Sequence, residues 1–140
     1  PDMYVNTGNE FSPEEGKVVY YTFDDGPSKN TIAILDTLKE KGVKATFFVT
    51  GQEVSGVDSD AILKRIVDEG HSIGMHTYSH VYQEIYSSVE NYLAVFQKIR
   101  EKIIRVTGVE PKIFRFPGGR GGAVTFIMIG IWYPAMINPI

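Results

Sequence analysis

The chain has no cysteine, so disulfide bonds and thiolate metal sites are excluded. Positive charge is also scarce, with 14 lysines and arginines against 17 acidic residues and a net charge of -3. Because no basic block stands out, nucleic-acid binding has no electrostatic support. No positively charged segment followed by an apolar one opens the chain, so we expect no signal peptide within it.

Charge of either sign is missing from residues 121–140, which are rich in apolar side chains. A membrane-spanning helix needs ~20 apolar residues, but two leading glycines together with Pro134 and Pro139 argue against one here. We therefore expect no membrane span and instead a buried strand near residues 124–132.

What is present is an ordinary composition for one globular domain of 140 residues, 43% hydrophobic and 22% charged. Apolar runs alternate with amphipathic segments, which indicates an α/β fold with parallel strands. We expect strands over residues 18–23 (buried), 43–49, 72–75 and 112–116. A loop over Pro27–Asn30 leads to a first helix that ends at Gly42, and further helices cover residues 58–69 and about 87–106.

The longest expected helix begins at a capping-box pattern, Ser87–Glu90, and ends at Gly108. Its apolar residues recur at helical spacing and form one stripe, which consists of Val89, Leu93, Phe96, Ile99, Ile103 and Val106. The second helix similarly turns Ile62, Leu63, Ile66 and Val67 inward.

Two short motifs follow expected strands. Asp24 and Asp25 stand together after the first strand, and His76 and His80 lie four residues apart after the third. Either motif alone is modest evidence, because Asp, Gly and Pro are common turn formers and a histidine pair on one helical turn is as often structural. The ends of parallel strands share one rim, however, so the four side chains are expected to meet there. One carboxylate and two imidazoles suit a catalytic zinc-type site, and the other carboxylate could act as a general base.

Arg115 is a cation within an apolar strand and therefore needs an anionic partner, for which Asp24 or Asp25 is the natural choice. The alternative is a guanidinium that lies in solvent. His71 follows the second helix and is interpreted as structural. Three tyrosines near the histidines could stack on sugar rings or simply pack against helices; these are Tyr78, Tyr82 and Tyr86.

Three segments occur in the order and spacing typical of one family: Thr22–Pro27, His76–His80 and Arg115–Gly119. On these motifs the chain resembles the polysaccharide deacetylases, the NodB-homology group of carbohydrate esterase family 4. Two further segments, Lys44–Gly51 and Glu69–Gly74, are similar to that family's second strand and its approach to the histidines. The resemblance covers about residues 17–119.

The resemblance implies a partial, deformed (β/α) barrel that hydrolyses N-acetyl groups of amino-sugar polymers such as peptidoglycan. O-acetylated xylan is a further substrate within the family. It further implies a bacterial enzyme that is secreted or associated with the cell envelope. By position, Asp25, His76 and His80 would hold one divalent metal ion, usually zinc, with cobalt or nickel as alternatives.

The same resemblance gives roles to other residues. Asp24 would be the general base, Arg115 would orient it, and the backbone N–H of Gly118 would help to stabilise the oxyanion. Pro117 and Tyr78 are the expected substrate-binding residues.

Two departures from the family pattern affect these expectations. The family often has Tyr where this chain has Gly118, and it continues with motifs that include a histidine acting as general acid, whereas no histidine follows His80. We therefore expect a lead-in segment over residues 1–16, a deacetylase domain over 17–119 and a divergent tail over 120–140. A frameshifted gene ending, a truncated product or a mis-assigned tail would each explain the change.

Three hypotheses for the function follow from these motifs and departures. The first is an incomplete deacetylase whose rate is reduced by at least about 10²–10⁴-fold against a full-length relative, for lack of the acid. The second is a non-catalytic metal- or glycan-binding remnant, and the third an unrelated metallohydrolase. An open parallel sheet would leave a bare edge, which residues 124–133 could cover as a fifth strand or a second copy could cover in a homodimer.

Overall fold

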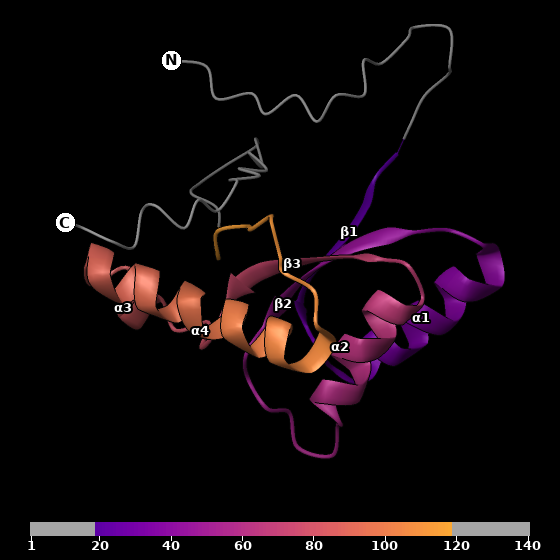
Figure 1. Cartoon of the computed structure of the whole chain (residues 1–140), viewed down its shortest axis with the longest axis horizontal. Helices are drawn as coiled ribbons and strands as arrows, with labels where there is room; N and C mark the ends of the chain where they lie inside the picture. The colour runs from indigo at the N-terminus through magenta and orange to yellow at the C-terminus, as the bar shows by residue number, and fades with distance from the viewer. Residues whose placement is uncertain (1–18, 119–140) are drawn as a thin grey trace, which may run out of the picture.

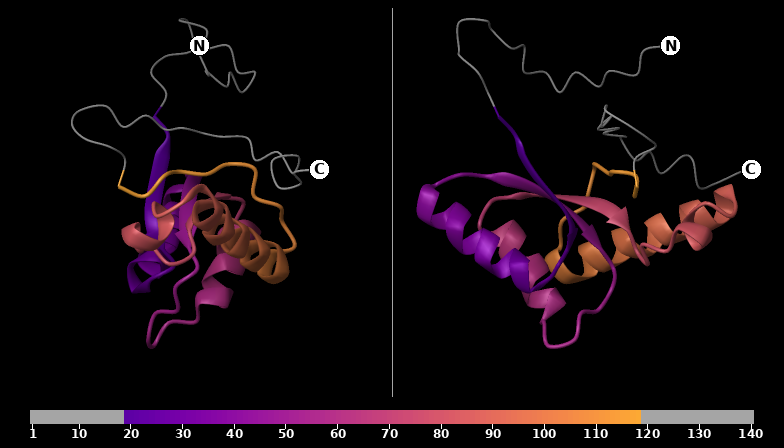
Figure 2. Two further views of the ribbon diagram at one scale, coloured as in Figure 1. Left: turned by 90° about the vertical axis from the view of Figure 1, so that its left-hand side faces the viewer. Right: turned by 180° about the vertical axis from the view of Figure 1, so that it is seen from behind.

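The computed structural model describes residues 19–118. Three parallel strands lie in the order β1-β2-β3, and helices α1, α2 and α4 lie along one side of this sheet (Figures 1 and 2). The elements in chain order are β1 (Tyr21–Gly26), α1 (Lys29–Lys41), β2 (Ala45–Thr50), α2 (Ser59–Asp68), β3 (Ser72–Thr77), α3 (Tyr82–Ile85) and α4 (Val89–Thr107). Within the described range, no helix is both long and apolar enough to span a membrane.

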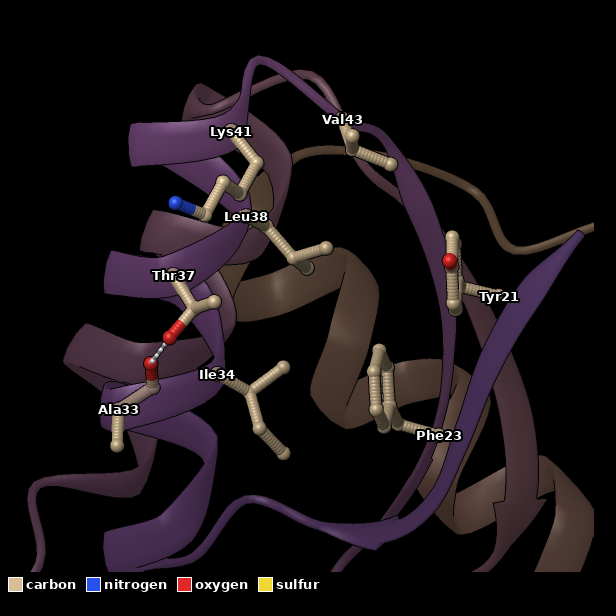
Figure 3. Close-up of a pocket in the computed structure, with 8 residues that line it drawn as sticks. All are labelled: Tyr21, Phe23, Ala33, Ile34, Thr37, Leu38, Lys41 and Val43. Atoms are coloured by element: carbon tan, nitrogen blue, oxygen red, sulfur yellow. Dashed lines mark hydrogen bonds between the residues drawn. The ribbon is translucent and has the colours of Figure 1, made fainter.

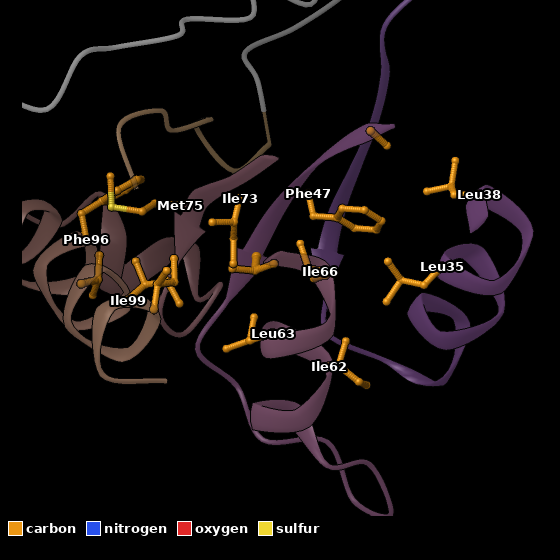
Figure 4. Packing of buried hydrophobic residues seen from close by; sticks show 14 of the residues in the cluster. Leu35, Leu38, Phe47, Ile62, Leu63, Ile66, Ile73, Met75, Phe96 and Ile99 are labelled. Atoms are coloured by element: carbon orange, nitrogen blue, oxygen red, sulfur yellow. The ribbon is translucent and has the colours of Figure 1, made fainter. Parts of the chain in front are cut away.

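The hydrophobic core lies between the sheet and its helices (Figure 4). Alternate strand residues point toward the helices, as the two-residue period of a strand requires. Phe47, Val49 and Met75 are fully or almost fully buried there. They meet apolar residues of the helices, which include Leu35, Leu38, Ile62, Leu63, Ile66, Phe96 and Ile99. Each such side chain contributes about 1.5–3 kcal/mol when it is removed from water.

The strand residues between these core positions point to the other face of the sheet. Phe48 is one of them, and its ring lies under the guanidinium of Arg115 rather than in the core cluster. Phe23 packs on Phe47 with ring centroids 5.2 Å apart, so its neighbours Thr22 and Asp24 share the face with Phe48. The alternation therefore separates an apolar face that holds the fold from a face that carries polar groups.

The strand predicted over residues 18–23 is present but displaced toward the C-terminus, and the prediction that it is buried was wrong; residue 18 lies outside the described residues. β1 begins at Tyr21 and continues through both aspartates to Gly26. Val19 and Tyr20 are exposed, at 72% and 67%. Both precede β1, and Tyr21 is exposed as well because β1 is the outer strand of the described sheet, with β2 on only one side of it. Aromatic and β-branched content thus indicated a strand but not how far its neighbours cover it.

The three longer helices were predicted well, with corrections at their N-terminal ends. The capping-box pattern predicted at Ser87–Glu90 is displaced by one residue, because Ser88 caps α4 and accepts from the N–H of Asn91. The loop expected over Pro27–Asn30 is too long, because α1 already begins at Lys29. Ser28 caps this helix, and its backbone N–H donates to Thr31 Oγ1 at 3.0 Å. Val89 was placed on the apolar stripe of α4 but is exposed, since it is the first residue of the helix. The short helix α3 was not predicted.

The fourth strand expected at residues 112–116 is present only as a single parallel bridge between Met75 and Phe114. Two hydrogen bonds hold it, from Met75 N–H to the Ile113 carbonyl and from Arg115 N–H to the Met75 carbonyl. This is enough to bring Arg115 beside β3. The lead-in segment 1–16 and the strand expected at 124–132 lie outside the described residues.

A buried lysine on α4 links that helix to the ends of the strands. Lys102 is only 3% exposed, although sequence analysis did not single it out. Its position three residues after Ile99, on the inward stripe, was the available signal. The ammonium donates to the Gly51 carbonyl at 3.2 Å and to a carboxylate oxygen of Glu53, and this contact holds the pKa of Glu53 below its usual range.

Gly51 in turn is fixed to the segment that carries the histidines. Its N–H is bonded to the carbonyl of Tyr78 at 2.9 Å. A Cβ on Gly51 would lie 2.6 Å from Tyr78 Cγ, so only glycine allows the ring to lie against the backbone. Lys102 thus anchors the segment after β2, and that segment anchors the one after β3.

His71 is buried and holds a second long-range contact. The N–H of Ala45 donates to His71 Nδ1 at 3.2 Å, which requires an unprotonated Nδ1. Burial, with the charge of Lys44 adding to it, lowers the pKa of His71 below 6.5. The histidine interpreted as structural from sequence therefore ties the start of β2 to the start of β3.

We predict that the pair formed by Lys102 and Glu53 contributes a measurable coupling energy. Glu53→Ala leaves a buried ammonium with one carbonyl partner, and we expect a loss of about 1–3 kcal/mol in the free energy of unfolding. In a Lys102→Met background the same change is a surface substitution and should cost less than about 0.5 kcal/mol. Denaturant unfolding of the four proteins gives the cycle; equal costs in both backgrounds would show that the pair contributes nothing.

We also predict that His71 makes stability fall in mild acid. Since its pKa is lowered in the folded state, the unfolded chain takes up the proton first as the pH falls below about 6.5. The contribution of neutral His71 is complete above that pH and is lost as the pH falls through the lowered folded pKa. His71→Gln, which keeps an acceptor for Ala45, should flatten the curve of unfolding free energy against pH. Parallel curves for both proteins would refute this.

Candidate functional site

The two aspartates of β1 are separated by a bulge. Asp24 pairs with Phe48 and Gly26 with Val49, so Asp25 is an extra residue in the ladder. Its φ of 64° places it in the left-handed region, which few non-glycine residues adopt. In a regular strand, neighbouring side chains would point to opposite faces. The bulge instead lets both carboxylates reach groups on the rim of the sheet.

The two histidines come from the end of β3 and the segment after it. The interpretation of the two histidines as one face of a helical turn is wrong, because His76 lies in β3 and His80 follows the strand. A φ of 53° at His80 bends the chain back, and the two rings lie with centroids 5.4 Å apart. His76 is buried, whereas His80 is partly exposed.

Asp25, His76 and His80 converge on one point. Asp25 Oδ1 is 3.3 Å from His76 Nε2 and 3.1 Å from His80 Nε2. One ligand atom from each residue lies within 4.8 Å of the others, and the Asp25 side chain remains 65% exposed. The arrangement therefore offers three metal-ligating atoms that open to solvent on one side.

The hydrogen bonding of His76 fits a cation at this point. Its Nδ1 lies 2.9 Å from the Arg115 carbonyl and donates to it, which leaves a lone pair on Nε2 in the neutral ring. Burial lowers the pKa of His76 and so favours that neutral form. A nitrogen lone pair then faces a carboxylate oxygen, and two such acceptors repel unless a cation lies between them. Two imidazoles and a carboxylate are ligands that zinc prefers.

Backbone strain coincides with this cluster. Among the described residues, the non-glycine positions with positive φ are Asp25 and His80. Such conformations cost about 1–3 kcal/mol each and gather where function requires a particular geometry. Both strained residues belong to the same three-residue cluster, which supports a functional and not merely structural pairing.

Arg115 binds the other aspartate. Its Nη1 donates to Asp24 Oδ1 at 2.6 Å and its Nη2 donates to Thr22 Oγ1 at 3.1 Å. The guanidinium carbon also lies 4.2 Å from the ring centroid of Phe48, a cation–π contact that fixes its plane. The alternative of an arginine head in solvent is therefore wrong, and of the two natural partners Asp24 is the one engaged.

The structure also places the remaining predicted site residues. Gly118 follows Arg115 by three residues and has a φ of 69°. The Pro117 carbonyl accepts a hydrogen bond from the Tyr86 hydroxyl at 2.7 Å. Tyr78 packs on Gly51, with Lys98 Nζ 5.9 Å from its ring centroid. Gly118 and Pro117 thus lie in the segment that follows Arg115, whereas the contacts of Tyr78 give it a structural role. The substrate role of Tyr78 stays a prediction.

A groove between β1 and α1 is a separate feature (Figure 3). It has a volume of about 400 Å³, and the side chains that line it are Tyr21, Phe23, Ala33, Ile34, Thr37, Leu38, Lys41 and Val43. Lys41 is the one charged residue of this lining, and no carboxylate or imidazole is among it. The groups able to do acid–base or metal chemistry therefore lie at the aspartate–histidine cluster and not in this groove.

Comparison with known proteins identifies relatives of the whole described region. Residues 12–127 match the family described as polysaccharide deacetylase. A peptidoglycan-N-acetylglucosamine deacetylase of Bacillus cereus is 37% identical over 118 residues, which are 84% of this chain and 42% of that protein.

Solved structures agree. A polysaccharide deacetylase from Bacillus cereus has a TM-score of 0.67 at 39% identity, and the alignment covers 74% of this chain and 49% of that protein's chain. A family 4 acetyl xylan esterase from Clostridium thermocellum, in complex with a cobalt ion, has a TM-score of 0.63 at 38% identity, covering 72% and 49%.

These matches agree with the expected fold and show how much of it the chain contains. The chain spans somewhat less than half the length of these relatives. Its unclosed parallel sheet with helices corresponds to part of their (β/α) barrel, as the resemblance implied. No support for a homodimer comes from the relatives or from the residues that the structure describes. On the extent of the match and the shared fold, the chain belongs to the polysaccharide deacetylase family.

Proposed function

We propose that the protein is a metal-dependent deacetylase that hydrolyses N-acetyl groups of an amino-sugar polymer. The observation that carries the proposal is the convergence of Asp25, His76 and His80 beside the pair of Asp24 and Arg115. Three ligands leave room for a substrate oxygen, and a separate carboxylate stands ready for proton transfer.

Asp25, His76 and His80 would hold the metal ion, for which zinc is our choice because of its preference for such ligands. A bound divalent cation supplies Lewis acidity, which polarises an amide carbonyl and acidifies a water molecule. The protein's part is to present the ligands in the correct protonation state. The hydrogen bond from His76 to the Arg115 carbonyl does this for one imidazole.

Asp24 would act as the general base. Phe48 and Thr22 hold the Arg115 guanidinium in place, and the guanidinium binds Oδ1 of Asp24. The second carboxylate oxygen has no contact with Arg115 among these bonds and can accept a proton from water that attacks the acetyl carbon. The backbone N–H of Gly118, three residues after Arg115, would donate to the oxygen on which negative charge develops.

The substrate class follows from the chemistry and from the relatives. A site that polarises a carbonyl and holds a base suits acetyl transfer to water, and the matched proteins include deacetylases of peptidoglycan N-acetylglucosamine and of chitin. We infer a polymer of N-acetylglucosamine, with peptidoglycan preferred, and a cell-envelope setting in a bacterium. Pro117 and Tyr78 remain proposed substrate-binding residues.

We predict that the protein binds one zinc ion through this cluster. His80→Ala removes one ligand without opening the core, because this side chain is partly exposed, and we expect zinc affinity to fall by at least about 10–100-fold. Calorimetric titration of metal-free protein measures this. His71→Gln is the matched control, since His71 lies away from the cluster, and its affinity should equal that of the unchanged protein. Unchanged affinity in His80→Ala would overturn the assignment.

We further predict that Asp24→Asn separates metal binding from catalysis. Zinc affinity should stay the same, whereas acetate release from an N-acetylglucosamine oligomer should fall by about 10²–10⁴-fold, because an amide cannot accept the proton. Circular dichroism would show that the fold is retained. If zinc affinity fell with activity, the division of roles between Asp24 and Asp25 would be wrong.

A further inference from the structure

Two tyrosines form an exposed aromatic ledge beside the proposed metal site. Tyr82 opens α3 and Tyr86 follows its last residue, and their rings stack with centroids 6.1 Å apart. The two residues are 48% and 52% exposed. The ledge is anchored from below by Ile85, which is fully buried. Single exposed aromatic residues are common on protein surfaces and need no explanation. Two stacked aromatic rings beside the proposed metal site call for a functional explanation.

The ledge touches the site on two sides. Tyr82 meets the ring of His80 edge to face, with centroids 5.5 Å apart and planes at 82°. The Tyr86 hydroxyl donates to the Pro117 carbonyl at 2.7 Å and so holds the segment that leads to Gly118. The ledge therefore borders both a proposed metal ligand and the proposed oxyanion donor.

Tyr82 also fills the space that a side chain at position 118 would need. A Cβ on Gly118 would lie 2.8 Å from Cζ of Tyr82 and closer still to its Cε1 and hydroxyl oxygen. The φ of 69° at Gly118 disfavours any L side chain as well. Where the family often has a tyrosine at position 118, this chain has glycine with an aromatic ring from α3 lying over it.

We propose that Tyr82, supported by Tyr86, is the sugar-binding platform next to the reacting acetyl group. The proposal rests on the proposed deacetylase function and names a specificity-determining residue for it. The C–H groups of a pyranose ring carry partial positive charge and meet the negative face of an aromatic ring. A sugar seated on the ledge would have its acetamido group beside the cluster, because Tyr82 contacts His80.

The experiment compares oligosaccharide binding among variants of the full chain loaded with zinc. The probe is an N-acetylglucosamine oligomer, titrated by calorimetry. Tyr82→Ala should weaken its binding by about 2–10-fold, as expected for loss of one ring contact. Tyr82→Trp should restore binding, because a larger ring keeps the contact. Tyr21→Ala is the matched control, since Tyr21 is an exposed tyrosine that lines the groove between β1 and α1, and it should bind like the unchanged protein.

Zinc affinity and acetate release, measured on the same proteins, separate the possible failures. Tyr82→Ala should keep the zinc affinity, because Tyr82 is not a ligand, while KM for deacetylation rises with the dissociation constant. Binding that depends on Tyr82 without any acetate release would leave the platform standing and overturn the proposed function. Equal binding by Tyr82→Ala and the unchanged protein, failure of Tyr82→Trp to restore binding, or no binding by any protein would overturn the platform.

Discussion

The meeting of one carboxylate oxygen with two imidazole nitrogens at the rim of the sheet constrains much of what surrounds it. Asp25 reaches the point only because β1 bulges, and His80 reaches it only because the chain turns back after β3. Both residues have strained backbone conformations, which persist only where the surrounding structure requires them. His76, which lies within β3, needs no such strain but is held in one tautomer by the Arg115 carbonyl. A cation between the three atoms is the simplest reason for this arrangement.

The rest of the fold keeps these groups in place through the two faces of the sheet. One face packs on three helices and provides the stability, while the other carries Asp24 with the arginine that orients it. Lys102 connects the hydrophobic core with the site. It lies on the buried stripe of α4, and its ammonium binds the Gly51 carbonyl in the segment that supports the histidines. The site thus lies at the ends of strands whose central residues are fixed by hydrophobic packing. The stability of that packing offsets the backbone strain at Asp25 and His80.

Sequence patterns foresaw the parts that depend on local periodicity. Spacing alone predicted the helices α1, α2 and α4, the glycine ends at Gly42 and Gly108, and the parallel pairing of the strands. What escaped prediction depends on tertiary contact. The bulge at Asp25 cannot be read from residue types, and the exposure of Tyr21 depends on which strand lies at the edge of the sheet. The role of Lys102 becomes visible only together with its partners Gly51 and Glu53. The site residues were named from motifs, yet the geometry that brings His80 back to Asp25 is a strand end and a bend, not a helical turn.

The most direct test of the account is X-ray absorption spectroscopy of the zinc-loaded protein, which counts imidazole ligands and measures their distances. The account predicts two imidazoles with zinc–nitrogen distances of about 2.0–2.1 Å and additional oxygen ligands. It also predicts a spectrum that is unchanged in His71→Gln and shows one imidazole in His80→Ala. A spectrum with no imidazole, or one that changes in His71→Gln but not in His80→Ala, would contradict the central claim.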